Sequence, residues 1–88
     1  MYLHLGGDTV VREEDIIGIF DMDQATVSYK TRDFLAAAEK SGRVEIVSPD
    51  LPKTFVVCRE NDDYRIYICQ LAPVTLIKRS GKRFGGNL

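Results

Sequence analysis

The first 23 residues, MYLHLGGDTVVREEDIIGIFDMD, divide into short apolar runs that are separated by residues typical of turns. In Tyr2–Leu5 the residues alternate, which places Leu3 and Leu5 on one face of a strand. The Gly-Gly-Asp sequence at 6–8 supplies a turn, and the short, β-branched segment Thr9–Val11 is predicted to pair back on the first strand. The chain is therefore expected to begin with a β-hairpin.

A second apolar run, Ile16–Phe20, follows the charged segment Glu13–Asp15, which we expect to form a solvated turn. The run is apolar at almost every position, and this pattern favours a strand that is covered on both faces and central in its sheet. Gly18 interrupts the run. A glycine inside a strand indicates either a β-bulge or a place where another group packs closely against the backbone.

One helix is predicted between Ser28 and Ser41, because this stretch is rich in residues that favour helices and is followed by Gly42 as a C-terminal cap. Its apolar residues fall on one stripe and most of its charged residues fall elsewhere, so the helix is expected to be amphipathic and to pack on the sheet. The stripe consists of Thr31, Phe34, Leu35 and Ala38.

The second half of the chain is predicted to add three strands. Arg43–Val47 alternates and is typical of a half-exposed strand, whereas two prolines between 48 and 53 indicate an exposed connection. Thr54–Cys58 and Tyr64–Cys69 flank a polar turn at 60–63 and are predicted to form a hairpin. Pro73 suits the first turn of a short helix that would end near Arg79.

These elements predict an α+β fold with a small antiparallel-rich sheet of about five strands, one packed helix and a short C-terminal helical turn. Residues 1–79 are expected to form a single domain, and 80–88 a flexible basic tail. A chain of 88 residues buries only about 60 to 65% of its unfolded surface, so association with further copies would stabilise it.

The composition favours a soluble protein. No apolar run approaches the roughly 20 residues that a membrane span needs, and no membrane partner is expected. The N-terminus has neither a basic segment followed by a long apolar stretch nor a small-residue cleavage site, which predicts a cytoplasmic location.

No residue pattern predicts catalysis, a cofactor or a metal site. His4 is the single histidine and has no partner at a catalytic spacing, and Gly6-Gly7 is followed by no phosphate-binding motif. Asp21 and Asp23 match no calcium-binding loop. The two cysteines, Cys58 and Cys69, lie inside apolar runs and are expected to be buried thiols rather than a disulfide or metal ligands.

The charge is unevenly distributed. The net charge is −1, but residues 78–88 carry +4, whereas 1–77, with eight basic and thirteen acidic residues, carry −5. The C-terminal cations are compatible with an arm that follows a phosphate backbone or with a solubilising tail. They are Lys78, Arg79, Lys82 and Arg83, with Phe84 beside them, and a scattered second set comprises Arg12, Arg43, Lys53, Arg59 and Arg65.

The order Met-Tyr-Leu-His-Leu-Gly, then Val10-Val11, then Asp15-Ile-Ile-Gly-Ile-Phe-Asp resembles the RemA/RemB-like regulators of extracellular matrix and biofilm genes, and is most similar to the RemB branch. The resemblance extends more loosely to about Arg79. It implies a small β-rich domain akin to the LytTR type, and a bacterial transcription regulator that assembles into rings and presents arginines to DNA. A ring would repeat a few cations per subunit along one rim.

The chain departs from the RemA pattern where that pattern has arginines. Asp15 stands at one such position, and Leu51 and Pro52 stand at a pair of them, which leaves only Lys53 nearby. What the resemblance implies is therefore a homo-oligomer that contacts DNA mainly through phosphates. The predicted contacts are Arg12, Arg43, Lys53, Lys78 and Arg79, with Lys82 and Arg83 as a supporting arm.

An alternative is a protein-interaction or scaffold module that has the same fold but does not bind DNA. The loss of the family arginines at Asp15 and at 51–52 favours it, and a related regulator protein would then be a partner. The positions of the cations in the folded domain discriminate between the two hypotheses.

Overall fold

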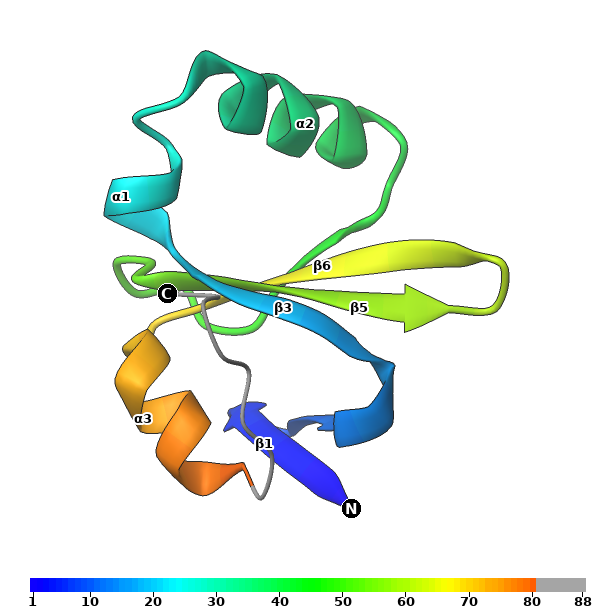
Figure 1. Cartoon of the computed structure of the whole chain (residues 1–88), viewed down its shortest axis with the longest axis vertical. Helices are drawn as coiled ribbons and strands as arrows, with labels where there is room; N and C mark the ends of the chain where they lie inside the picture. The colour runs from blue at the N-terminus through cyan, green and yellow to red at the C-terminus, as the bar shows by residue number, and fades with distance from the viewer. Residues whose placement is uncertain (81–88) are drawn as a thin grey trace.

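The computed structural model of this chain describes residues 1–80 and has the α+β fold expected from the sequence (Figure 1). The strands are β1 (Tyr2–Gly6), β2 (Thr9–Arg12), β3 (Ile16–Asp21), β4 (Val44–Ile46), β5 (Thr54–Glu60) and β6 (Asp63–Cys69). The helices are α1 (Met22–Ala25), α2 (Tyr29–Lys40) and α3 (Pro73–Arg79), and Glu13–Asp15 form one turn of 3-10 helix.

The strands are divided between two sheets. β1 and β2 form the predicted antiparallel hairpin, in which Leu3 pairs with Val11. The other four strands form a sheet in the order β3-β5-β6-β4, where only the β4–β6 pair is parallel. β3 is thus an edge strand, and the prediction that it is central was wrong. Its apolar run does not mean burial on both faces, since the side chain of Ile17 remains 56% exposed.

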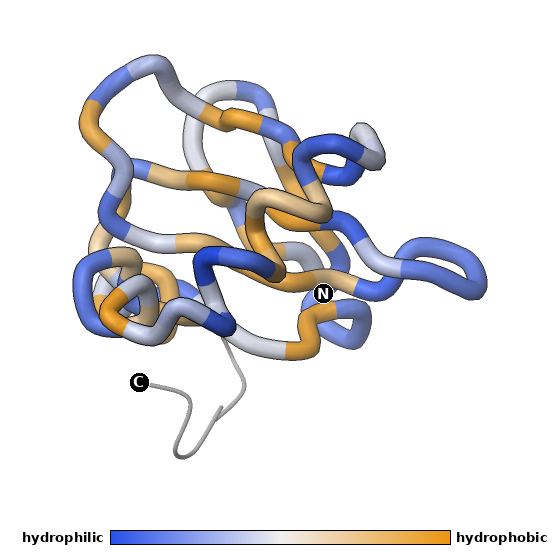
Figure 2. Tube along the Cα trace, turned by 90° about the horizontal axis from the view of Figure 1, so that it is seen from above, coloured by the Kyte–Doolittle hydropathy of each residue, from blue (hydrophilic) through white to orange (hydrophobic). Residues whose placement is uncertain are grey.

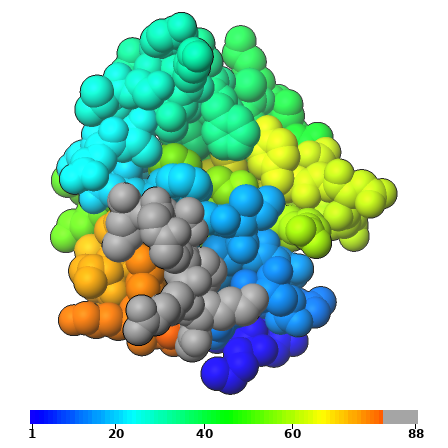
Figure 3. Space-filling model, in the orientation of Figure 1, coloured from blue at the N-terminus to red at the C-terminus, as the bar shows by residue number. Residues whose placement is uncertain are grey.

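The four-stranded sheet is the middle of three layers (Figure 1). α2 covers one face, while the β1–β2 hairpin and α3 cover the other, so that these layers lie at opposite ends of the molecule in the space-filling view (Figure 3). Hydrophobic residues run along the strands, and hydrophilic residues predominate at the outer turns (Figure 2). None of the helices in residues 1–80 is long and apolar enough to cross a membrane.

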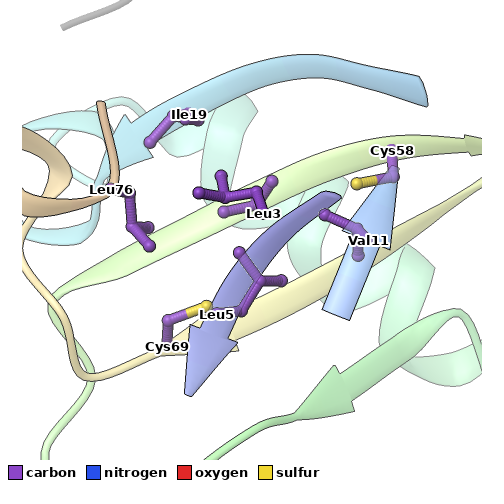
Figure 4. Close-up of a cluster of buried hydrophobic side chains, with 8 residues drawn as sticks. Leu3, Leu5, Val11, Ile19, Cys58, Cys69 and Leu76 are labelled. Carbon is purple, nitrogen blue, oxygen red and sulfur yellow. The ribbon is translucent and has the colours of Figure 1, made fainter. Parts of the chain in front are cut away.

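Each face of the sheet contributes to its own core. On the hairpin face, Leu3, Leu5 and Val11 pack with side chains from the sheet and with Leu76 of α3, and these side chains point toward one another (Figure 4). On the other face, Ala38 of α2 packs with Phe55, Val57 and Ile66. Successive β5 residues alternate between the two cores, as the two-residue period of a strand requires.

The structure confirms the predicted long helix and its end. α2 begins after Ser28 and ends at Lys40, and Gly42 adopts a positive φ of 73°, which glycine reaches without strain. The Gly42 amide donates to the Glu39 carbonyl and the Arg43 amide donates to the Ala38 carbonyl, so the last turn is closed by two hydrogen bonds. The predicted short helix after Pro73 is also confirmed, as α3.

Two features of the N-terminal third differ from the sequence predictions. Glu13 was expected in a solvated turn, but its side chain is only 4% exposed and accepts a hydrogen bond of 3.1 Å from the Ser80 hydroxyl. Ser80 directly follows α3, so the end of that helix brings the hydroxyl to this turn. α1 was not predicted from the sequence. It is a single turn whose N-terminus is capped by Asp21, where the carboxylate accepts a hydrogen bond of 3.0 Å from the Gln24 amide.

Gly18 has both of the roles that a glycine in this strand suggested. The pairing register of β3 with β5 shifts between Ile16 and Gly18, which is a bulge. A Cβ at Gly18 would also lie 2.6 Å from two ring carbons of Phe20, a ring that stacks on Phe55 with centroids 5.1 Å apart. The glycine therefore lets the Phe20 ring fold back over its own strand.

Truncation of Leu76 to alanine tests whether α3 belongs to the core. Leu76 is fully buried against the hairpin, so Leu76→Ala is expected to lower the free energy of unfolding by about 3 kcal/mol. The control is Val74→Ala on the same helix. Val74 is 52% exposed, so its truncation should change the free energy of unfolding by less than about 1 kcal/mol. Urea denaturation followed by circular dichroism measures both, and equal effects would contradict the packing of α3.

Candidate nucleic-acid interface

The structure describes five of the seven cationic residues that were predicted to contact DNA, and it places them in different layers. Lys82 and Arg83 lie outside the described residues. Arg12 ends β2 on the hairpin side of the sheet, Arg43 precedes β4, and Lys53 precedes β5. Lys78 and Arg79 form the last turn of α3, where cations interact favourably with the negative end of the helix dipole.

Arg12 is occupied by neighbouring carboxylates. Its guanidinium lies 2.9 Å from the Glu14 carboxylate and 3.9 Å from that of Asp15. The hydrogen bond with Glu14 raises the pKa of Arg12, and the same contact lowers the pKa of Glu14. All three side chains are solvent-accessible, so the pairs are weak, but their charges cancel the local attraction of Arg12 for a polyanion.

Arg43 lies on the opposite face of the sheet from Arg12 and is also paired. Its guanidinium forms an ion pair with Asp63 and sits 5.2 Å from the centre of the Tyr64 ring. That ring stacks in turn on Phe34 of α2, with centroids 5.4 Å apart. Arg43 therefore joins the start of β4 to the β5–β6 turn and to the helix layer, which is a structural role.

Lys53, Lys78 and Arg79 are exposed and form no ion pair with a residue of the described part of the chain. Lys53 precedes the first residue of β5, whereas Arg43 contacts Asp63, which is paired with the last residue of that strand. Seven residues of strand span roughly 20 Å, so Lys53 and Arg43 lie at opposite ends of the sheet.

Arg59 is a further unpaired cation of the described chain, and it was not among the predicted DNA contacts. It directly follows the buried residues Thr54–Cys58 of β5 and is exposed, and no ion pair engages it within residues 1–80. Arg65, which the sequence does not distinguish from Arg59, is held by Glu60. Arg59 and Arg12 line the same open pocket of about 510 Å³, together with Asp15, Asn61 and Tyr67. The fold therefore brings Arg12, a predicted DNA contact, together with Arg59, which was not predicted to be one.

Asp21 and His4, the other residues considered as candidate ligands or catalytic groups, occupy positions explained by the fold. Asp21 is used as the cap of α1, and His4 points outward from β1. Among residues 1–80, no three His, Cys, Asp or Glu side chains are grouped so that they could hold a metal ion.

The two cysteines are buried free thiols, as the sequence predicted. Cys69 pairs with Thr54 across the β5–β6 ladder, and Cys58 lies four residues further along β5, about 13 Å away. A disulfide requires Cα atoms within roughly 7 Å of each other, so these thiols cannot be joined in this fold. Burial raises the pKa of Cys58 and of Cys69 to about 12.

No protein-family model matches this chain. One curated protein, extracellular matrix regulatory protein B of Bacillus subtilis (strain 168), is 41% identical over 80 residues. The aligned region covers 91% of this chain and 90% of that protein, so the similarity extends over both proteins almost from end to end.

The raised thiol pKa values give a pH prediction. A thiol with a pKa of about 12 is protonated at about pH 8, so a thiol-specific disulfide reagent should react roughly 1000-fold more slowly with the folded chain than with the chain in denaturant. Because the folded pKa values exceed those of unfolded cysteine, the thiols favour folding below about pH 8.5, and this contribution decreases as the pH rises toward 12. Equally rapid labelling of both states would contradict the burial.

Proposed function

Because the chain belongs to the RemB-like family of extracellular matrix regulators, we propose that it regulates extracellular matrix or biofilm gene expression in a bacterium, as a homo-oligomer that contacts DNA phosphates. The observation that carries the proposal is the 41% identity over 91% of the chain with a protein named as a regulator of the extracellular matrix. The role is regulatory and involves no catalysis, and the protein acts in the cytoplasm.

The DNA part of the proposal is supported by cations that have no carboxylate partner within residues 1–80. Lys53, Lys78 and Arg79 are the predicted contacts that are free to bind a phosphate without first breaking an ion pair. Arg59 joins them on the same criterion, whereas Arg12 and Arg43 would have to leave Glu14 and Asp63. Lys82 and Arg83 remain the proposed supporting arm.

An oligomer resolves the conflict between these cations and the acidic character of the subunit. Residues 1–77 carry a net charge of −5, so one subunit has little general attraction for DNA. Several copies in a closed assembly would repeat the free cations along one surface, where phosphate contacts release counterions and supply most of the affinity. Binding of this kind reads no base sequence directly.

A salt titration tests the phosphate contacts. Fluorescence anisotropy with a labelled DNA duplex at about 50 and 200 mM salt should show binding that weakens steeply with salt, and the slope of log K against log salt should shrink by about one for each contact removed. Lys53→Gln, Arg59→Gln, Lys78→Gln and Arg79→Gln are the informative variants. Arg12→Gln and Arg43→Gln are matched controls, since their charges are already paired, and they should change the slope less.

A second candidate function is a protein-interaction or scaffold module without DNA binding. The observation in its favour is the distribution of the predicted contacts, because Arg12 and Arg43 lie on opposite faces of the sheet and Lys53 lies at the far end from Arg43. No binding to DNA at about 50 mM salt by protein that is verified to be oligomeric, together with co-elution with a purified related regulator, would favour the scaffold and contradict the DNA proposal.

A further inference from the structure

An apolar groove of about 370 Å³ lies between α2 and the β3 side of the four-stranded sheet, and it is called the α2 groove below. Three phenylalanine rings line it, those of Phe20, Phe34 and Phe55, and Ile17 and Val57 add aliphatic surface. Pockets that hold small molecules have volumes of roughly 300 to 1,000 Å³ and are mostly apolar. The α2 groove therefore has the size and the lining of a small-molecule site.

The aromatic part of the lining is fixed by contacts within the fold. Phe20 stacks on Phe55 with ring centroids 5.1 Å apart, and the missing side chain of Gly18 makes room for the Phe20 ring. Phe34 stacks on Tyr64 with centroids 5.4 Å apart. Because these rings are already held in place, a ligand that packs on them loses little affinity to the ordering of side chains.

Part of this apolar lining is still in contact with solvent. The side chain of Ile17 is 56% exposed and that of Phe34 is 39% exposed, although both face the groove. A ligand with an apolar body would remove this area from water, which is the main source of affinity in such a site.

The polar groups of the lining are consecutive residues of α2, Lys30 and Thr31. They belong to the first turn of the helix, where the positive end of the helix dipole adds to the charge of the lysine. The lining contains no acidic residue, and Lys30 forms no ion pair within residues 1–80. The α2 groove therefore combines an apolar body with one unopposed positive charge.

The larger pocket beside Arg59 has a different character. Its lining includes Arg12 and Arg59, but also the carboxylates of Asp15 and Glu60. Positive and negative side chains offset each other there, so that pocket does not favour an anion. Between these two pockets, the combination of an apolar lining and an unopposed cation belongs to the α2 groove.

We propose that the α2 groove binds a small apolar monocarboxylate. The apolar body of the ligand packs against the phenylalanine rings and Ile17, while its carboxylate accepts hydrogen bonds from the Lys30 ammonium and the Thr31 hydroxyl. A cation would be repelled by Lys30, and a dianion would have to lose more hydration than one lysine can replace. The inference goes beyond the proposed function and depends on neither DNA binding nor association.

Binding of 2-naphthoate tests the class of ligand. The chain contains no tryptophan, so the fluorescence anisotropy of the naphthyl ring can be followed without tryptophan emission. The full-length chain should bind 2-naphthoate with a Kd below about 1 mM. Two probes with the same ring serve as controls: neutral 2-naphthalenemethanol should bind about fivefold more weakly, and cationic 2-naphthylmethylamine at least about tenfold more weakly.

A charge substitution tests the role of Lys30. Lys30→Gln should raise the Kd of 2-naphthoate about fivefold and leave that of 2-naphthalenemethanol unchanged, because only the carboxylate uses the ammonium group. Lys40→Gln removes the same charge from the other end of α2, and Arg59→Gln removes one from the larger pocket. Neither control should change the Kd of either probe.

A pair of isoleucine substitutions tests the apolar part of the groove. Ile17→Asn should raise the Kd of both 2-naphthoate and 2-naphthalenemethanol about tenfold, since it removes apolar contact area. Ile46→Asn makes the same change on β4, where the isoleucine is 64% exposed and lies outside the lining, and should change neither Kd. Circular dichroism and melting cooperativity should match the wild type for both variants, and the Lys30 comparison does not depend on them.

Four results would overturn the proposal. They are no binding of 2-naphthoate at about 1 mM, equal affinity for 2-naphthoate and 2-naphthalenemethanol, an unchanged Kd in Lys30→Gln or in folded Ile17→Asn, and a Kd that rises with protein concentration. The last result would show that a second copy of the chain occupies the groove. DNA binding in the salt titration is a separate measurement, so its failure would refute the DNA proposal and leave the ligand site standing.

Discussion

The fold depends on one strand that is buried on both faces. Thr54–Cys58 of β5 are all buried, with Phe55 and Val57 packed under α2 and Val56 and Cys58 packed against the hairpin. A chain of this size has little apolar surface to bury, and a single two-faced sheet lets both outer layers share it. The buried Thr54 hydroxyl fits this strand because it donates to the Leu71 carbonyl at 2.6 Å, so no polar cost remains.

The layered arrangement also determines which cations are available. Carboxylates that are close in sequence occupy Arg12 and Arg65, and Asp63, which begins the neighbouring strand β6, occupies Arg43. The free cations are left at strand and helix ends, where no acid of the described chain reaches them. A subunit with this distribution offers polyanions a few separated contacts, and for that reason the proposed DNA binding depends on the proposed association between copies.

The edge strand β3 combines buried residues with exposed apolar ones. β3 contributes Ile19 to the hairpin-side core, so the strand must be apolar to fold. The bulge at Gly18 leaves Ile17 at the surface beside Phe20 and Phe34, and the strand is therefore apolar on a face that this subunit does not cover. The residues that hold β3 in its own sheet are thus accompanied by apolar surface that stays exposed beside them.

The sequence by itself determined most of the local structure: the first hairpin, α2 with its end at Gly42, the β5–β6 hairpin, α3, and the two buried thiols. These features follow from side-chain periodicity and turn residues, which act between near neighbours. Only the tertiary structure decided that β3 is an edge strand, that Glu13 is buried and bonded to Ser80, and that within residues 1–80 Arg43 is paired while Arg59 is not. Each of these depends on which distant segments lie side by side, and that order is fixed by how the layers share the sheet rather than by any short stretch of the chain.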